Sequence, residues 1–280
     1  MDRLTNYFFG IITIYLFIIE GMADDHLLIL TGLLFSYILA YIAFLLNWIT
    51  LDATKSVIVL GTVTLGFGGW WLAFAMIFFF LSSAILTRRK LKSGVIDFEK
   101  RHIHHDLQKR RDGYQVWANG FWVGVFVIGW FFTQSPAFLI GAFAVIATAT
   151  ADTWSTELGT TKPGKTHLIT TFKTVEPGTD GGVSFKGTLA AFFGSLFIAL
   201  FTLPVTDFSL SIFILVFLAG FVGGLVDSFA GAILQTGALK KIKPEDFVRS
   251  GHALKNSLVN WMSTGIGGIV AIIIATLIYL

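Results

Sequence analysis

Four carboxylates fall between positions 152 and 180 of this 280-residue chain, in a segment that also supplies lysines, hydroxyls and glycines: Asp152, Glu157, Glu176 and Asp180. Carboxylate oxygens are ligands that Mg²⁺ prefers, and a bound Mg²⁺ can bridge to phosphate oxygens. Lysines add positive charge, and glycine-rich turns expose backbone N–H groups to anions. These residue types together predict a site for Mg²⁺ and nucleotide phosphates. A plain surface loop would account for the glycines, but less well for the crowded carboxylates.

A glycine-rich turn ends this segment. Gly178, Gly181 and Gly182 lie just before an expected helix start near Ser184. The N-terminus of a helix carries partial positive charge and unpaired N–H groups, so it would bring an anion site to the carboxylates. The turn is not a Walker A loop, because the chain does not contain the pattern G-x-x-x-x-G-K-[ST].

Further polar residues interrupt apolar stretches elsewhere in the chain. Asp227 and Ser228 lie near the end of one such stretch, and Asn256 and Asn260 share a helix face at the start of the last one. A carboxylate at the centre of a membrane helix costs about 2.5–3.5 kcal/mol on insertion scales, so an Asp in such a place is a functional candidate by default. Pairing for helix packing is the alternative. The asparagines could equally cap a helix or bind phosphate or metal.

The segment 87–115 is strongly basic, with nine Lys or Arg side chains against four acidic ones. It could lie on anionic lipid headgroups or help to bind an anionic substrate. A metal site at His102, His104 and His105 is a weaker interpretation, because no acidic or thiol partner is spaced with them. Gln115 and Asn119 follow as an i,i+4 pair on one helix face, where they could contact a ligand or satisfy neighbouring backbone.

The elements that must position these residues are membrane helices. Hydrophobic residues make up 55% of the chain and charged residues 13%, which excludes an ordinary soluble domain. The absence of cysteine excludes disulfides and thiolate metal sites. The sequence predicts an all-α, polytopic membrane helix bundle of about nine spans, at 7–21, 27–47, 52–67, 70–87, 116–134, 137–152, 187–204, 210–235 and 257–279.

The first apolar run lacks a small-residue cleavage site, so we expect it to be a helix of the bundle rather than a removable signal. Residues 1–50 are predicted to form an N-terminal helix pair, and residues 51–280 a membrane-embedded catalytic domain. The glycines at 66, 68 and 69 favour a tight hairpin over one long tilted helix in the segment 52–87.

The basic residues give the orientation. All 20 Lys and Arg fall in the connections on one side of this topology, and none falls in the opposite connections. By the positive-inside rule the basic side is cytoplasmic, with the N-terminus inside and the C-terminus outside. Asp152, Asp227 and Asn256 then converge on the cytoplasmic face. We expect an integral protein of a bacterial cell membrane with its site facing the cytoplasm.

Several of these strings carry a resemblance to a known family. The stretches Ala151–Gly159, Pro177–Ser184, Gly224–Ser228 and Arg111–Gly120 resemble the integral-membrane family that contains the plant and cyanobacterial phytyl-phosphate kinases and uncharacterised animal transmembrane relatives. The likeness extends from about Leu51 to the C-terminus. More loosely, Lys173-Thr-Val-Glu176 is similar to the Lys-[Thr/Ser]-x-Glu-Gly pattern of CTP-dependent lipid enzymes such as dolichol kinase, although Pro177 departs from that pattern.

The resemblance implies a membrane kinase that transfers a phosphoryl group from a nucleoside triphosphate, with CTP indicated, to an isoprenyl monophosphate. Its partners would be the nucleotide, the isoprenyl phosphate and membrane lipids, with no nucleic acid and with a homodimer left open. Mg²⁺ is the expected cofactor, held by Asp152, Glu157 and Asp227 directly or through water. These three and Lys173 would be catalytic. The expected substrate- and nucleotide-binding residues are Lys162, Lys165, Thr174, Glu176, Gly178, Asp180, Gly181, Gly182, Ser184, Ser228, Gln115, Asn119, Asn256 and Asn260.

Two other classes remain open from the sequence. A membrane transporter or lipid flippase would also place polar residues in membrane helices, often as paired broken helices of inverted repeats, and we find no convincing pair of that kind. A CTP-dependent cytidylyltransferase acting on a lipid phosphate would use much the same triphosphate site. Isoprenoid chain length does not follow from the sequence.

Overall fold

The computed structural model describes residues 2–92, 110–160, 164–234 and 248–279. Lys162 and the three histidines of the basic segment lie outside the described residues. The elements are α1 (Asp2–Tyr15), a π-helical turn (Leu16–Glu20), α2 (Ala23–Leu45), α3 (Leu51–Lys92), α4 (Gly113–Thr133), α5 (Pro136–Gly159), β1 (Thr166–Leu168), β2 (Thr174–Val175), β3 (Gly182–Ser184), α6 (Phe185–Leu200), a 3₁₀ turn (Leu203–Val205), α7 (Leu210–Leu234) and α8 (Val248–Tyr279).

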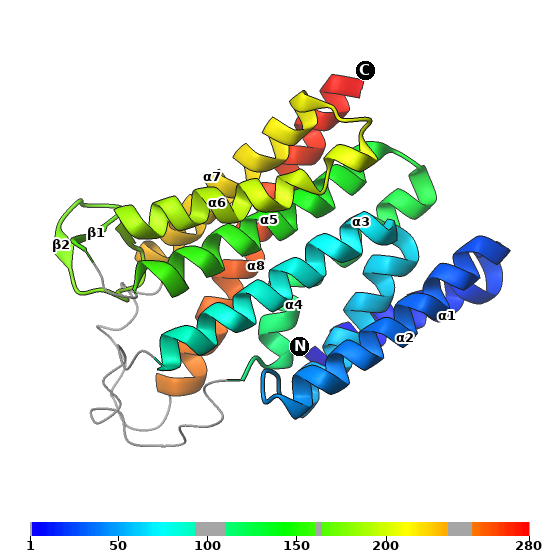
Figure 1. Ribbon diagram of the computed structural model, residues 1–280, viewed down its shortest axis with the longest axis horizontal. Helices are drawn as coiled ribbons and strands as arrows, with labels where there is room; N and C mark the ends of the chain where they lie inside the picture. Colours follow the sequence, from blue (N-terminus) through cyan, green and yellow to red (C-terminus); the bar gives the residue numbers. More distant parts are fainter. Residues whose placement is uncertain (1, 93–109, 161–163, 235–247, 280) are drawn as a thin grey trace.

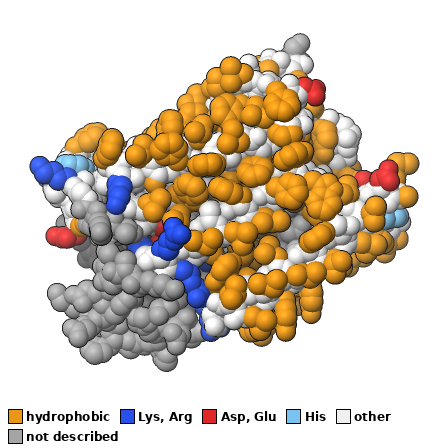
Figure 2. Space-filling view, viewed as in Figure 1, with side chains coloured by type: hydrophobic (Ala, Val, Ile, Leu, Met, Phe, Trp, Pro, Cys, Tyr) orange, Lys and Arg blue, Asp and Glu red, His pale blue; other side chains and the backbone are white. Residues whose placement is uncertain are grey.

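The described part of the chain is a polytopic membrane bundle. Eight of its helices are long and apolar enough to cross a bilayer, with α3 counted once over its whole length. On the face shown in Figure 2, hydrophobic side chains cover most of the surface, and Lys and Arg side chains gather at one end. The polytopic helical class predicted from composition is therefore confirmed.

The long helix α3 is two helices joined at Gly69, whose backbone (φ 77°, ψ −178°) is outside the helical region. A residue with a side chain rarely adopts this conformation, whereas glycine does so readily. Beyond Gly69 the chain doubles back, because the Phe80 ring lies 6.2 Å from that of Trp48, which precedes α3. The two halves of α3 leave the turn in different directions in Figure 1. The break expected at the glycines of this segment is therefore present.

Helix α5 is the centre of the bundle. It packs against α3, α4, α6, α7 and α8, and 78% of the residues in its apolar 18-residue stretch are buried. It continues to Gly159, a full two turns beyond the end predicted at 152. The prediction was wrong because it followed hydropathy alone, and the polar residues from 153 to 158 include no glycine or proline to end the helix. Glu157, which was expected beyond the helix, is thus a helical residue, as Asp152 was predicted to be.

Glycines let α7 approach α5 at backbone contact. A Cβ added at Gly220 would overlap the Cβ of Ala147, and one at Gly224 would lie 3.1 Å from the Cβ of Ala151. This is the close small-residue packing that a G-x-x-x-G spacing predicts in membrane helices. One turn beyond Gly224, the same seam brings Asp227 beside the last turns of α5.

A small antiparallel sheet, which the sequence did not predict, connects α5 to α6. Its strand order is β2-β1-β3, and Thr166 on β1 pairs with Val175 on one side and Ser184 on the other. The strands are two or three residues long, too short to show a period-2 pattern in the sequence. The sheet holds the glycine turn, which comes just before β3.

The N-terminal helices pack on the same core. Phe9 of α1 is fully buried and stacks on Trp117 of α4, with 4.9 Å between ring centroids. Helix α2 packs on the first half of α3, where a Cβ at Gly61 would lie 2.6 Å from the Cβ of Ser36. Large apolar side chains on the other faces of α1 and α2 are exposed, as expected for helices that contact lipid.

Candidate active site

A polar cavity of about 350 Å³ lies where α3, α4, α5, α7, α8 and the β3 turn converge. We call it the polar cavity. Of the residues that the sequence predicted for the site, its lining includes Gln115, Asn119, Asp152, Glu157, Gly178, Asp180, Gly181, Gly182, Ser184, Asp227, Ser228, Asn256 and Asn260. Segments far apart in the sequence therefore meet here, as the predicted topology required.

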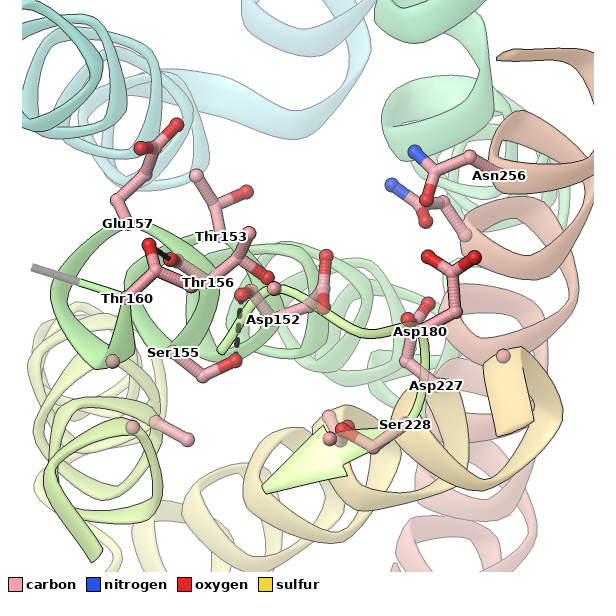
Figure 3. A pocket seen from close by; sticks show the side chains of 18 of the residues that line it. Asp152, Thr153, Ser155, Thr156, Glu157, Thr160, Asp180, Asp227, Ser228 and Asn256 are labelled. Atoms are coloured by element: carbon pink, nitrogen blue, oxygen red, sulfur yellow. Dashed lines mark hydrogen bonds between the residues drawn. The ribbon is translucent and has the colours of Figure 1, made fainter. Parts of the chain in front are cut away.

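Two carboxyl groups from different helices form the centre of the polar cavity. Asp152 on α5 and Asp227 on α7 are close enough to share a hydrogen bond, and Asp227 is only 8% exposed. Figure 3 shows the two side chains at the middle of the lining, with Asn256 and Asp180 on one side and Glu157 on the other. Buried carboxylates this close need a proton or a cation between them.

Helix α8 holds Asp227 in place. The Ser263 hydroxyl donates to Asp227 Oδ2 at 2.7 Å, and one turn earlier Asn260 Nδ2 donates to Asn119 Oδ1 at 3.4 Å. The buried Oδ1 of Asn260 accepts no hydrogen bond from any described residue. A buried acceptor without a donor is costly, so this oxygen is suited to a ligand. Ser263 was missed from the sequence, although positions 256, 260 and 263 share one helix face.

Glu157 lines the polar cavity and is held by α3. Its Oε1 accepts a hydrogen bond from the Thr87 hydroxyl at 2.7 Å, and its Oε2 lies 3.4 Å from Lys90 Nζ, both on α3. Over the ranges the structure describes, no three His, Cys, Asp or Glu side chains form one metal-binding group. Asp152 and Asp227 form a close pair, with Glu157 in the same lining, and the role of the three carboxylates at a metal ion stays a prediction.

Polar side chains of α3 and of the last turns of α5 contact each other directly. Trp154 Nε1 donates to the Ser82 hydroxyl at 3.1 Å, next to the contacts that Thr87 and Lys90 make with Glu157. Polar groups in an apolar bundle satisfy one another in this way at modest gain in stability. Ser155 and Thr156 point into the polar cavity between these contacts and Asp152.

The glycine turn closes the cavity against α7. Gly178 and Gly181 have positive φ (86° and 76°), and a Cβ at Gly181 would lie 2.6 Å from the Cα of Ala232. Ser184 then caps α6, with its Oγ accepting from the Gly187 N–H at 3.1 Å. The predicted arrangement of a glycine turn followed by a helix start is present, and it faces the carboxyl pair across the cavity.

Three arginines in the lining were not named from the sequence: Arg88, Arg110 and Arg111. Arg111 lies just before α4 and pairs with the connection between α2 and α3, where its N–H donates to the Trp48 carbonyl and its carbonyl accepts from the Thr50 N–H. Its guanidinium stacks 5.5 Å from the Phe79 ring centroid. Burial lowers the Arg111 pKa, and the nearby Glu157 charge opposes this shift. Arg111 is the last basic residue of the segment 87–115, and this position was the available indication in the sequence that it could be a site residue.

Gln115 and Asn119 have structural contacts as well as a place in the lining. Asp112 caps α4 by accepting from the Gln115 N–H at 2.9 Å, and Gln115 Oε1 accepts from the Asp112 N–H at 3.3 Å. This reciprocal pair is a capping box. Burial raises the pKa of Asp112, and its hydrogen bonds from the helix start oppose that shift. Asn119 Nδ2 donates to the Gln115 carbonyl at 3.1 Å.

Four of the predicted residues lie outside the lining of the polar cavity. Lys165 and Lys173 flank the first two strands and are exposed, and so are Thr174 and Glu176. In this arrangement the positive charge at the cavity wall comes from arginines, and the roles of these four residues stay predictions.

The fold and the site define a class: a polytopic helical membrane protein with a buried acidic pair in a polar cavity at the basic end of its bundle. The family described as integral membrane protein DUF92 has a model that matches residues 34–268. The chain therefore belongs to this family, and the predicted family membership is confirmed.

Relatives of this chain occur in archaea and plants. It is 34% identical to an uncharacterized membrane protein of Methanocaldococcus jannaschii over 77% of this chain and 81% of the relative. It is 30% identical to protein PGR of Arabidopsis thaliana over 64% and 70% of the two chains. It is 33% identical to protein VTE6, chloroplastic, of the same plant over 50% of this chain and 38% of VTE6. No solved structure matches.

Proposed function

We propose that this protein is a membrane kinase that transfers the γ-phosphoryl group of a nucleoside triphosphate to an isoprenyl monophosphate. The observation that carries the proposal is the acidic pair of Asp152 and Asp227, which faces a glycine turn and arginines inside one polar cavity. The family resemblance supports the isoprenyl substrate, and the Lys173–Glu176 string favours CTP as the nucleotide. Phosphoryl transfer asks a protein mainly for positioning and charge neutralisation, which these groups supply.

The residues present fit a magnesium ion. Mg²⁺ in nucleotide sites is commonly held by one or two carboxylates together with substrate phosphates and waters. Asp152 and Asp227 provide two carboxyl groups at hydrogen-bonding distance, and the unpaired Oδ1 of Asn260 provides a nearby neutral oxygen. When bound, the ion would neutralise phosphate charge. We assign Asp152 and Asp227 as its ligands, and Glu157 to holding α3 against α5.

The reaction needs no strong base from the protein. A monophosphate oxygen of the acceptor, already an anion, forms a bond to the γ-phosphorus while the bond from that phosphorus to the β–γ bridging oxygen breaks. The products are an isoprenyl diphosphate and a nucleoside diphosphate, and no proton has to be removed from the attacking oxygen. The glycine turn and the start of α6 would hold the nucleotide phosphates, and Arg111, with Gln115 and Asn119, would hold the acceptor.

We infer the orientation in the membrane from the distribution of charge. Counting the halves of α3 separately gives nine spans in the described ranges, and with that number the positive-inside rule favours an N-terminus and a polar cavity on the cytoplasmic side. Lys and Arg side chains at one end of the bundle support this assignment. Cytoplasmic nucleotide would thus reach the cavity directly, while the isoprenyl tail stays in the bilayer. We propose a cell membrane as the location.

The deciding experiment measures whether the γ-phosphorus or the α-phosphorus of labelled CTP is transferred to the lipid. Purified protein in lipid nanodiscs is incubated with Mg²⁺, geranylgeranyl or phytyl monophosphate, and CTP labelled at either the γ- or the α-phosphorus. A kinase moves γ-label into an extractable isoprenyl diphosphate and releases CDP. Unlabelled ATP, GTP and UTP as competitors test the choice of nucleotide.

Two outcomes would contradict the kinase. Transfer of α-label with release of pyrophosphate would establish a cytidylyltransferase. If no nucleotide is consumed with any isoprenyl phosphate, the kinase assignment fails and transport of a lipid becomes the better explanation. The Asp227→Asn variant, which keeps the size of the side chain, serves as the inactive control.

A further inference from the structure

A second cavity, almost wholly apolar, lies beside the polar cavity. It has a volume of about 290 Å³ and is enclosed by one face of α2, both halves of α3 and the start of α4. We call it the apolar cavity. Its lining includes Phe35, Leu39, Leu60, Met76 and Phe79. None of the predicted catalytic or metal-binding residues lies in it.

The wall of the apolar cavity offers a ligand few polar groups except at one end. The hydroxyl of Ser36 donates to the Gly32 carbonyl at 2.6 Å, and that of Thr64 donates to the Leu60 carbonyl at 2.7 Å. Hydroxyls that bond to their own helix present little hydrogen-bonding capacity to a ligand. A cavity of this kind favours a hydrocarbon occupant.

The polar end is shared with the polar cavity. Phe80, Arg111, Gln115 and Asn119 line both cavities. The Arg111 guanidinium makes no ion pair with any described residue, and the nearby Glu157 is paired with Lys90. A cation at the boundary between an apolar and a polar space is suited to the phosphate of an amphiphile, with its tail on one side and the reacting oxygen on the other.

The dimensions set a scale for the tail. The α2 residues that line the apolar cavity run from Gly32 to Ile42, about 15 Å at the helical rise. A carbon chain of single bonds of about 1.5 Å advances by about 1.3 Å per bond, so about twelve bonds, or three isoprene units, fit this length. Phe35 and Ile38 line the cavity and are 51% and 44% exposed, so its wall on α2 is open toward the surroundings.

We propose that the apolar cavity binds the isoprenyl tail of the acceptor and that the phosphate lies at Arg111. The tail would enter the cavity laterally from the bilayer, between α2 and α3. This inference rests on the proposed function and defines its substrate: a single-chain lipid phosphate whose first three isoprene units are enclosed. Chains longer than this extend past α2 into the lipid. The N-terminal helices then form part of the binding site.

A matched pair of substitutions on α2 tests the proposal. Leu39 lines the apolar cavity, and Leu34, five residues earlier, is 59% exposed and does not. Leu39→Trp should lower kcat/KM for geranylgeranyl phosphate at least about tenfold by displacing several buried methylenes, and change that for dimethylallyl phosphate, whose single isoprene unit ends before Leu39, by less than about twofold. Leu34→Trp should change neither. Equal losses for both chain lengths in Leu39→Trp would overturn the assignment.

A binding measurement separates this inference from the proposed function. A farnesyl-length alkyl phosphate with a terminal diazirine is photolysed with the protein in nanodiscs without nucleotide, and the adducts are mapped by mass spectrometry. Adducts on α2 and α3 that Leu39→Trp abolishes would support the apolar cavity even if no kinase activity is found. Adducts confined to other helices would overturn it even if the kinase is active. Thermal unfolding and gel filtration of both variants check that each is folded.

Discussion

Replacing Asp227 by Asn removes one charge from the acidic pair and little else. Asn has nearly the same volume, and its Oδ1 can still accept the hydrogen bond from Ser263. Asp207→Asn is a matched control, because Asp207 is exposed in the connection between α6 and α7 and its positive φ (48°) suits Asn as well as Asp. Any difference between the two variants therefore reports the charge at the pair.

The expected loss can be worked from the geometry. The lost interaction is that between the Asp227 carboxylate and the bound cation. Two unit charges about 4 Å apart interact by about 4 kcal/mol at an effective dielectric constant of about 20. If solvent and neighbouring groups offset a third of this, about 2.7 kcal/mol remains, or about a hundredfold in turnover. Asp152→Asn should cost a similar factor. The double variant should lose much less than the product of the two, because both residues would serve one ion.

The assay is transfer of γ-label from CTP to geranylgeranyl phosphate, measured over a range of Mg²⁺ concentrations. A pair that only packs two helices makes the opposite prediction. Removing one of two repelling charges would then raise the unfolding temperature and leave turnover near that of the wild type. Losses that multiply fully in the double variant would also refute a shared ion.

Two other predictions concern the glycine turn and the orientation. Gly181→Ala should lower both turnover and the unfolding temperature more than Gly178→Ala, because both glycines have positive φ but only Gly181 is crowded, by Ala232. Overpacking of this kind costs about 1–3 kcal/mol of stability. Equal effects of the two substitutions would show that crowding is unimportant. In this cysteine-free chain, Lys165→Cys should react with a membrane-impermeant thiol reagent only after permeabilisation, and Asp207→Cys should react in intact cells; labelling of position 165 in intact cells would reverse the topology.

Much of the arrangement could be predicted because membrane burial and charge leave few alternatives. Apolar length fixes the spans, and the one-sided Lys and Arg residues fix which ends meet, so Asp152, Asp227 and Asn256 could be placed together before any contact was known. Gly69 marked the turn in α3 because few other residues take its conformation. Hydropathy, charge and the conformational freedom of glycine are properties of single residues, so they can be read without knowing any contact.

What could not be predicted depends on contacts between segments. The pairing of Glu157 with Lys90 depends on how α3 and α5 are rotated, which hydropathy does not report. Arg111 was one of nine basic residues in its segment, and its backbone pairing with Trp48 and Thr50, which holds it at the cavity, could not be read from the sequence. The strands beside Lys173 are too short to leave a pattern in the sequence, so the position of that lysine followed from neither period nor charge.

The glycine seam between α5 and α7 has a consequence for how the protein responds to its bilayer. Backbones already in contact cannot approach further. In the apolar 18-residue stretch of α5, 78% of the residues are buried, against 28% in that of α2. A bilayer that is too thick or too thin tilts the helices it touches most, at a cost of fractions of a kcal/mol per ångström. The lipid-facing α2 would take up that strain before the acidic pair moves. Membrane thickness should therefore alter which tail lengths are accepted more than the rate of the chemical step.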